Sequence, residues 1–60
     1  MQEYEITYLS YTPRIQHKTR EIDLINADSL AYNSGCVEFY KDGELIAIYN
    51  LKYVVKIEIW

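Results

Sequence analysis

The chain has 60 residues, half of them hydrophobic, and a formal net charge of -3 at pH 7. A chain of this length holds a single domain and buries only about 60% of the surface that it exposes when unfolded. The acidic balance counts against nucleic acid as the main partner, because neutralisation of phosphate charge supplies most of the affinity of nucleic-acid-binding domains.

Domains this small are usually stabilised by disulfides, a metal or a partner subunit. The one cysteine, Cys36, excludes an intramolecular disulfide, and the one histidine, His17, excludes a Cys/His zinc pattern. We therefore expect no cofactor, no metal and a homo-oligomer, with a dimer favoured. Seven tyrosines favour the same conclusion, because tyrosine suits half-buried sheet faces and interfaces.

The sequence predicts a cytoplasmic location. A lone cysteine fits a reducing compartment. No basic start is followed by an apolar run, so we expect no signal peptide. No run approaches the ~18 apolar residues of a membrane span, so we expect no membrane partner.

The first half of the chain predicts two or three strands. Residues 2–11 alternate between apolar and polar, and Thr12-Pro13 ends this strand in a turn. Residues 15–25 form a second strand, paired antiparallel with the first. Residues 27–32 are either a short strand, which we favour, or one helical turn capped by Asn26 or Asp28.

A β-hairpin is the clearest prediction in the second half. After a turn at Asn33-Ser34-Gly35, two alternating runs, 36–41 and 44–49, flank Asp42-Gly43, which is typical of a type I′ turn. The expected register places Lys41 opposite Glu44, Phe39 opposite Ile46 and Val37 opposite Ile48. The first hairpin face, which we assign to the core, comprises Val37, Phe39, Ile46 and Ile48.

The fold class is therefore all-β: one domain over residues 1–60, a four- to five-stranded antiparallel meander forming a small barrel or a curved sheet. Residues 53–60 form the last strand. The second hairpin face is also apolar apart from Glu38; it carries Cys36, Tyr40, Leu45, Ala47 and Tyr49. A single layer with a solvated back would be more polar there. We expect this face to be enclosed by barrel closure or by another chain.

No residue pattern indicates an enzyme. Cys36 and His17 are the only pair that suggests a nucleophile and base, and no motif surrounds either one. Glu3 and Glu5, like Glu21 and Asp23, have the spacing of any solvated strand face. We expect no catalytic residues.

Two sets of residues are candidates for binding. The first set is a candidate protein interface, formed by Tyr40, Leu45, Tyr49, Tyr53 and Trp60. It is rich in aromatic side chains, which contribute much of the binding energy of protein interfaces. Trp60 alternatively lies as a lid over the edge of the core. The second is a basic segment without acids that would contact an anion or an acidic partner: Arg14, His17, Lys18 and Arg20. Its alternative is a solvated loop and strand balanced by neighbouring acids.

The second hairpin and the last strand also carry a family resemblance. The segments 27–30 and 35–49, with Phe39-Tyr40-Lys41-Asp42-Gly43-Glu44-Leu45-Ile46-Ala47 at the centre of the second one, and the closing Val54-Val55-Lys56-Ile57-Glu58 resemble very short, mostly uncharacterised β-proteins encoded by phages and prophages of Gram-positive bacteria. The match covers about half of the chain. It implies an accessory protein of a mobile element that acts by binding, including as an inhibitor.

These observations favour a non-enzymatic protein that binds another protein stoichiometrically, such as a phage-encoded inhibitor of a host or antiviral-defence protein. The alternative is an Sm- or SH3-like small barrel that binds nucleic acid or a nucleotide through the segment from Arg14 to Arg20.

Overall fold

The computed structural model describes residues 2–14 and 16–60 and confirms an all-β chain. It contains six strands rather than four or five: β1 (Gln2–Thr12), β2 (His17–Ala27), β3 (Ser29–Asn33), β4 (Cys36–Lys41), β5 (Glu44–Asn50) and β6 (Val54–Ile59). The choice of strand over helical turn for residues 27–32 is correct, since most of them form β3. The described residues contain no helix that could cross a membrane.

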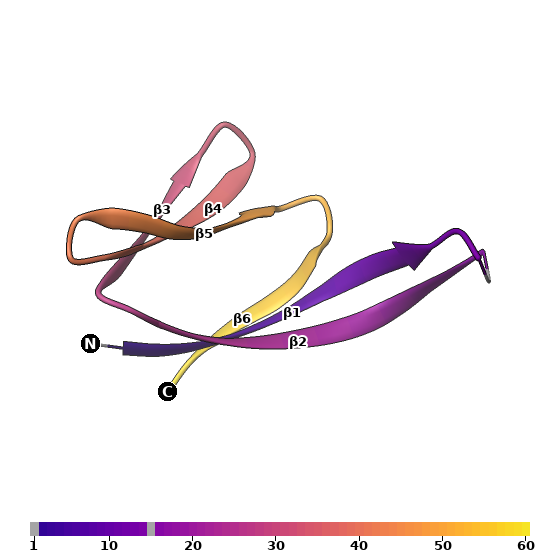
Figure 1. The fold of residues 1–60 in the computed structure, drawn as a ribbon, viewed down its shortest axis with the longest axis horizontal. Helices are drawn as coiled ribbons and strands as arrows, with labels where there is room; N and C mark the ends of the chain where they lie inside the picture. Colours follow the sequence, from indigo (N-terminus) through magenta and orange to yellow (C-terminus); the bar gives the residue numbers. More distant parts are fainter. Residues whose placement is uncertain (1, 15) are drawn as a thin grey trace.

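The strands form two antiparallel sheets, β2-β1-β6 and β3-β4-β5, and the second lies over the first (Figure 1). The predictions of one meander and of a closed barrel are therefore wrong. A meander would pair β6 with β5, but β6 pairs with β1. The chain changes sheet at Asp28, whose N–H donates to the Tyr40 carbonyl (2.8 Å) and whose carboxylate accepts from the Asp42 N–H (2.8 Å). Because this bend moves β3 away from β2, the two sheets remain separate.

A second corner carries the chain from β5 back to the first sheet. The Leu51 N–H donates to the Gly35 carbonyl (2.9 Å), and the Leu9 N–H donates to the Tyr53 carbonyl (2.8 Å). The chain ends lie at the opposite end of β1 and β6, where the Trp60 N–H donates to the Glu3 carbonyl (2.9 Å) (Figure 1). The bond between Leu9 and Tyr53 joins the first sheet to the chain that leaves the second one, as the bond between Asp28 and Tyr40 does in the other direction.

The core lies between the two sheets and is small. Its buried apolar residues are Tyr4, Ile6, Ala27, Val37 and Phe39. The Tyr4 and Phe39 rings meet edge to face with their centres 5.2 Å apart, a favoured aromatic geometry. The placement of Val37 and Phe39 in the core is confirmed, but the placement of Ile46 and Ile48 there is wrong, because they are 45% and 55% exposed.

A β-bulge explains this difference. The hairpin starts as predicted, with Lys41 opposite Glu44, but the register shifts by one residue between Tyr40 and Phe39. Phe39 then lies opposite Ala47 instead of Ile46, and Val37 lies opposite Tyr49 instead of Ile48. Since side chains alternate between faces, one extra residue on β5 moves all later residues to the other face. Ala47 and Tyr49 therefore face the core, and Ile48 faces away from it.

A long hairpin extends the molecule beyond its core. The principal extents are 38 × 24 × 16 Å, and the radius of gyration is 12.3 Å, against about 10 Å for a compact domain of this length. The excess comes from the ends of β1 and β2, which project past the second sheet (Figure 1). The two sheets thus cover each other's inner faces and leave both outer faces uncovered.

The Asp42-Gly43 turn has the predicted positive φ at both residues, 53° and 79°. A β-carbon at Gly43 would meet no atom within 4 Å, so any cost of Gly43→Ala is conformational. We expect this substitution to lower the free energy of unfolding by about 1 kcal/mol, measured by urea denaturation. Glu44→Gln, one residue away in ordinary strand conformation, is the control and should change it by less than about 0.5 kcal/mol. Equal effects of the two would contradict the conformational explanation.

Candidate protein-binding surface

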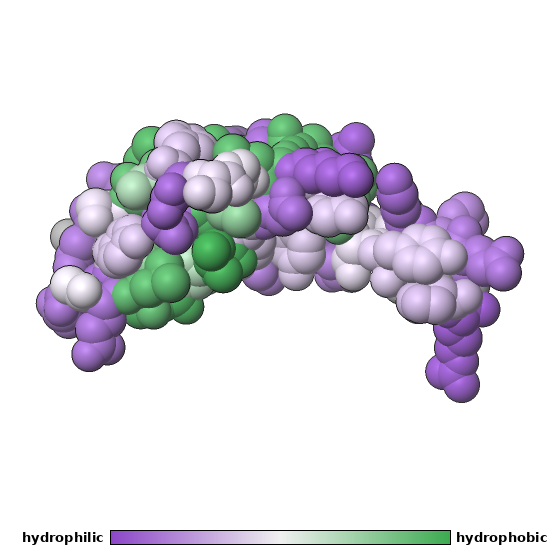
Figure 2. Space-filling view, turned by 90° about the horizontal axis from the view of Figure 1, so that it is seen from above, coloured by the Kyte–Doolittle hydropathy of each residue, from purple (hydrophilic) through white to green (hydrophobic). Residues whose placement is uncertain are grey.

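The outer face of the second sheet carries a strip of exposed aliphatic side chains along β5. Leu45 is 50% exposed, Ile46 in the bulge 45% and Ile48 55%. Tyr40 lies directly across from Leu45. We call these four residues the outer patch. Figure 2 views the molecule from the side on which the second sheet lies, and hydrophobic side chains reach the surface there, away from the hydrophilic end of the long hairpin.

One carboxylate lies beside the outer patch. The Tyr40 hydroxyl donates to Glu38 Oε1 at 2.8 Å. This hydrogen bond, followed by desolvation, raises the pKa of Tyr40 above its ordinary value. The pair directs the Tyr40 hydroxyl to a neighbour on the same strand. The Tyr40 ring therefore presents apolar surface next to a satisfied polar group, as interface tyrosines commonly do.

The structure brings together only two of the five predicted interface residues, Tyr40 and Leu45. Tyr53 lies in the corner between β5 and β6, 42% exposed, with the Lys52 ammonium 5.8 Å from its ring centre. Trp60 is 66% exposed at the end of β6. Tyr49 faces the core. Neither form of the Trp60 prediction, as a core lid or as an interface residue, is tested by its exposure alone.

Sequence reasoning missed Ile46 and Ile48 as surface residues. The run Leu45-Ile46-Ala47-Ile48 is apolar at odd and even positions alike, so alternation does not determine which of its faces is buried. An apolar run without alternation is therefore the one feature of the sequence that indicates exposed aliphatic side chains on β5.

Tyr49 instead links the two sheets. Its hydroxyl donates to Asp23 Oδ2 on β2 at 2.7 Å. Its ring centre lies 5.5 Å from that of Tyr8 and 5.9 Å from that of Phe39. Desolvation and, second, the hydrogen bond to Asp23 raise the pKa of Tyr49 far above its ordinary value. Desolvation and then the Asp23 charge also raise the pKa of Tyr8. Tyr49 therefore stabilises the fold and is not part of the outer patch.

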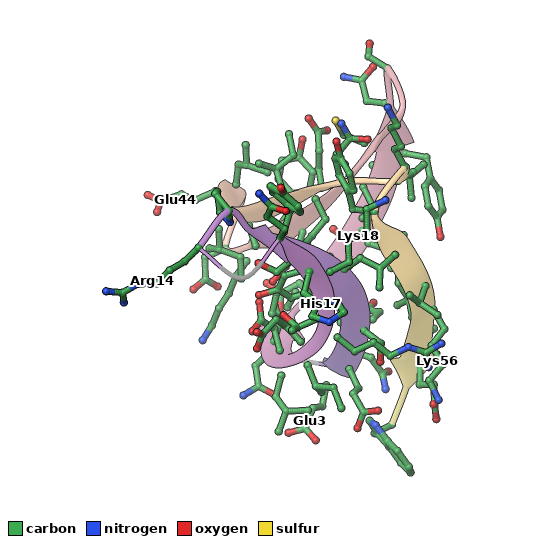
Figure 3. The ribbon with its side chains drawn as sticks, turned by 90° about the vertical axis from the view of Figure 1, so that its right-hand side faces the viewer. Glu3, Arg14, His17, Lys18, Glu44 and Lys56 are labelled. Carbon is green, nitrogen blue, oxygen red and sulfur yellow. The ribbon has the colours of Figure 1, made fainter. Side chains whose placement is uncertain are left out.

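The structure distributes the predicted basic residues over different sides of the long hairpin. Lys18 lies opposite Tyr11, and Arg20 opposite Leu9, on one face, whereas His17 belongs to the other face. Arg14 points away from the sheets at the hairpin tip (Figure 3). All four basic residues are exposed. Ile15, within the same segment, lies outside the described residues.

Another cation, Lys56 on β6, lies on the same side of the first sheet as Lys18 and Arg20, because it pairs with Thr7. Its ammonium lies 2.6 Å from Glu58 Oε1. This bond is the main reason that the pKa of Lys56 is raised, and desolvation, followed by repulsion from Arg20, opposes the rise. Positive charge on this face is therefore partly neutralised.

The reactive side chains do not assemble into a site. His17 lies by the hairpin tip of the first sheet, and Cys36 begins β4 in the second sheet. Among residues 2–14 and 16–60 no group of three metal-ligating side chains and no pocket is found. The features that remain for function are the exposed surfaces and edges.

Comparison with known proteins adds no relative: the chain matches no protein-family model, no curated protein and no solved structure.

The contact between Tyr49 and Asp23 gives a stability prediction. We expect Tyr49→Phe to lower the free energy of unfolding by about 1–2 kcal/mol, because it leaves a partly buried carboxylate without its donor. Tyr32→Phe is the matched control, since Tyr32 is 64% exposed on β3, and should have little effect. Urea denaturation at pH 7 measures both. A Tyr49→Phe protein as stable as the control would show that the bond contributes nothing.

The same bond predicts a pH dependence. Unfolded tyrosines lose their proton near pH 10, whereas folded Tyr49 keeps its proton to higher pH. The stabilisation is thus complete below about pH 10 and is lost as the pH rises further. The alkaline decline should be shallower in Tyr49→Phe and unchanged in Tyr32→Phe; parallel declines in all three proteins would contradict the assignment.

Proposed function

We propose that this protein is a non-enzymatic binding protein that makes a stoichiometric contact with another protein through its outer patch. The observation that carries the proposal is the exposure of Leu45, Ile46 and Ile48 next to Tyr40 on one sheet face. Contiguous exposed aliphatic groups are typical of interaction surfaces. Burial of each such side chain contributes about 1.5–3 kcal/mol.

The size of the molecule supports the proposal. A standard interface buries about 800 Å² on each partner, and the accessible surface of the chain is 4451 Å². An interface of this size, centred on the outer patch, would therefore cover less than about a fifth of the accessible surface of the chain. The polar groups beside the patch include Glu38, bonded to Tyr40, and resemble the polar rim of other interfaces.

The resemblance to small phage and prophage proteins supplies the class of partner. We propose a protein of the host cell, including a component of antiviral defence, met in the cytoplasm. This step rests on the resemblance of residues 27–30, 35–49 and 54–58, and the outer patch is the surface on which it can be tested.

The test compares matched substitutions on the two outer faces. Leu45→Asp and Ile48→Asp place a charge in the outer patch, where the side chains are 50% and 55% exposed. Leu24→Asp and Ile22→Asp place one on β2, at positions that are somewhat more exposed, 64% and 60%. Tagged variants are used to capture proteins from host extract, and the captured partner is then purified and titrated. We expect the β2 variants to bind like wild type and the patch variants to bind about tenfold to a hundredfold more weakly.

The solution mass of the complex, measured by light scattering, should show a fixed ratio of the two proteins. Loss of binding in the β2 variants with retention in the patch variants would place the interface on the other sheet and overturn the proposal. Retention in all four would overturn it as well.

A second candidate, contact with single-stranded nucleic acid, is favoured by one observation. Lys18 and Arg20 share a face with Tyr11, which is 58% exposed, and cations beside an exposed ring are typical of single-strand binding. Binding of oligonucleotides, followed by fluorescence anisotropy, should then weaken as salt rises and in Lys18→Glu. Binding that is absent at low salt, or that Leu45→Asp abolishes and Lys18→Glu spares, would exclude this candidate.

A further inference from the structure

The outer edge of the first sheet at β6 is unpaired within the described chain. β6 pairs only with β1, and Figure 3 shows it as the outermost ribbon on its side of the molecule, with Lys56 beside it. An unpaired strand edge is a template for pairing with another strand, unless a proline, a bulge or an unfavourable charge blocks it.

The backbone of β6 determines which residues face this edge. The Trp60 N–H donates to the Glu3 carbonyl at 2.9 Å, so Trp60 turns its polar groups toward β1. Because these directions alternate along an antiparallel ladder, Glu58 and Lys56 do the same. Ile57 and Ile59 then direct their N–H and C=O groups outward, where a further strand can pair with them.

The sequence of β6 is complementary to itself about Ile57. In an antiparallel alignment centred on that residue, Ile57 lies opposite Ile57 of the second copy, Lys56 opposite Glu58 and Glu58 opposite Lys56. Both opposite-charge pairs occupy positions without direct backbone bonds, where facing side chains are closest. Ile57 lies at the hydrogen-bonded position and exchanges both backbone bonds with its counterpart.

We propose that two copies of this chain pair antiparallel along β6, in the register centred on Ile57, and form one continuous six-stranded sheet. The self-complementary contact closes as a two-fold dimer. Within one chain, Lys56 and Glu58 bond to each other at 2.6 Å, and both side chains are exposed, 57% and 40%. Dimer formation exchanges this bond for the equivalent bonds to the second copy.

The other strand edges fit a second copy less well. The full-length alignment of β2 on itself centres on Ile22 and brings Glu21 opposite Asp23 of the second copy, which repel each other. β5 has its register shift at Ile46, in the middle of the strand, where a bulge disrupts edge pairing. The shift in β6 lies at Val55, outside the segment 56–58 that carries the proposed charge pairs. β3 has five residues and no charge that would select an alignment. Charge complementarity therefore selects β6.

The inference goes beyond the proposed function and uses none of its residues. The outer patch belongs to the second sheet and stays free when β6 is paired. A dimer would carry two outer patches, and such bivalence raises the apparent affinity for a partner with two sites without any new contact.

Charge reversal at β6 tests the register. Lys56→Glu leaves two carboxylates at positions 56 and 58, and Glu58→Lys leaves two ammonium groups. Each variant alone faces like charges in its own dimer, so its dimer should dissociate about tenfold or more readily than wild type. An equimolar mixture of the two restores both opposite-charge pairs and should dimerise again. Sedimentation of the 7.2 kDa chain over a concentration series measures this.

Ile59→Pro tests the backbone part of the proposal. It removes an N–H that faces the second copy and none that bonds to β1, a position where a strand tolerates proline. We expect a folded monomer, with the fold checked by far-UV circular dichroism. The Leu45→Asp protein serves as the control and should dimerise like wild type.

Three results would overturn the proposal. They are a wild type that stays monomeric at the highest soluble concentration, single charge variants that dimerise as wild type does, and a mixture that fails to recover the dimer. Since none of them involves capture of a host protein, failure here is distinguishable from failure of the proposed function.

Discussion

The arrangement of this molecule depends on the bulge in β5. One extra residue at Ile46 turns Tyr49 toward the space between the sheets, where it meets Phe39 and Tyr8 and bonds to Asp23. Without the bulge, Ile48 would occupy the inner face, and no hydroxyl would reach β2 from that position. The same shift sends Ile48 to the surface. Joining the sheets and exposing the outer patch are therefore two consequences of a single change of register.

The small size of the chain explains why so much apolar surface stays exposed. Two three-stranded sheets have four faces, and packing them together buries two of these. The remaining two carry exposed aliphatic residues such as Leu24 on β2 and Ile48 on β5. Within 60 residues no further element is present among the described residues to cover them. A partner, either the same chain or another protein, would bury part of this surface and add to a thin margin of stability.

Charge distinguishes the possible contacts. The Glu38 carboxylate beside the outer patch is bonded to Tyr40, so the patch suits an apolar partner surface. The β6 edge alternates Lys56 and Glu58 about a central isoleucine and suits a strand of the same sequence. The basic side chains of the long hairpin are divided between its faces and its tip, and only Lys18 and Arg20 of the four share a face. The two proposed contacts lie on different sheets and can form together.

The sequence alone determined the all-β class, the positions of most strands and the turn at Asp42-Gly43. Local chemistry was sufficient for these, because alternation, Pro13 and the Asp42-Gly43 turn act over a few residues. The tertiary structure decided the rest. The bend at Asp28 separates the sheets, the long-range pairing of β1 with β6 replaces a meander, and the bulge at Ile46 selects the exposed face of β5. A run that is apolar at every position fits either register, so only the packing of Tyr49 against the opposite sheet decides between them.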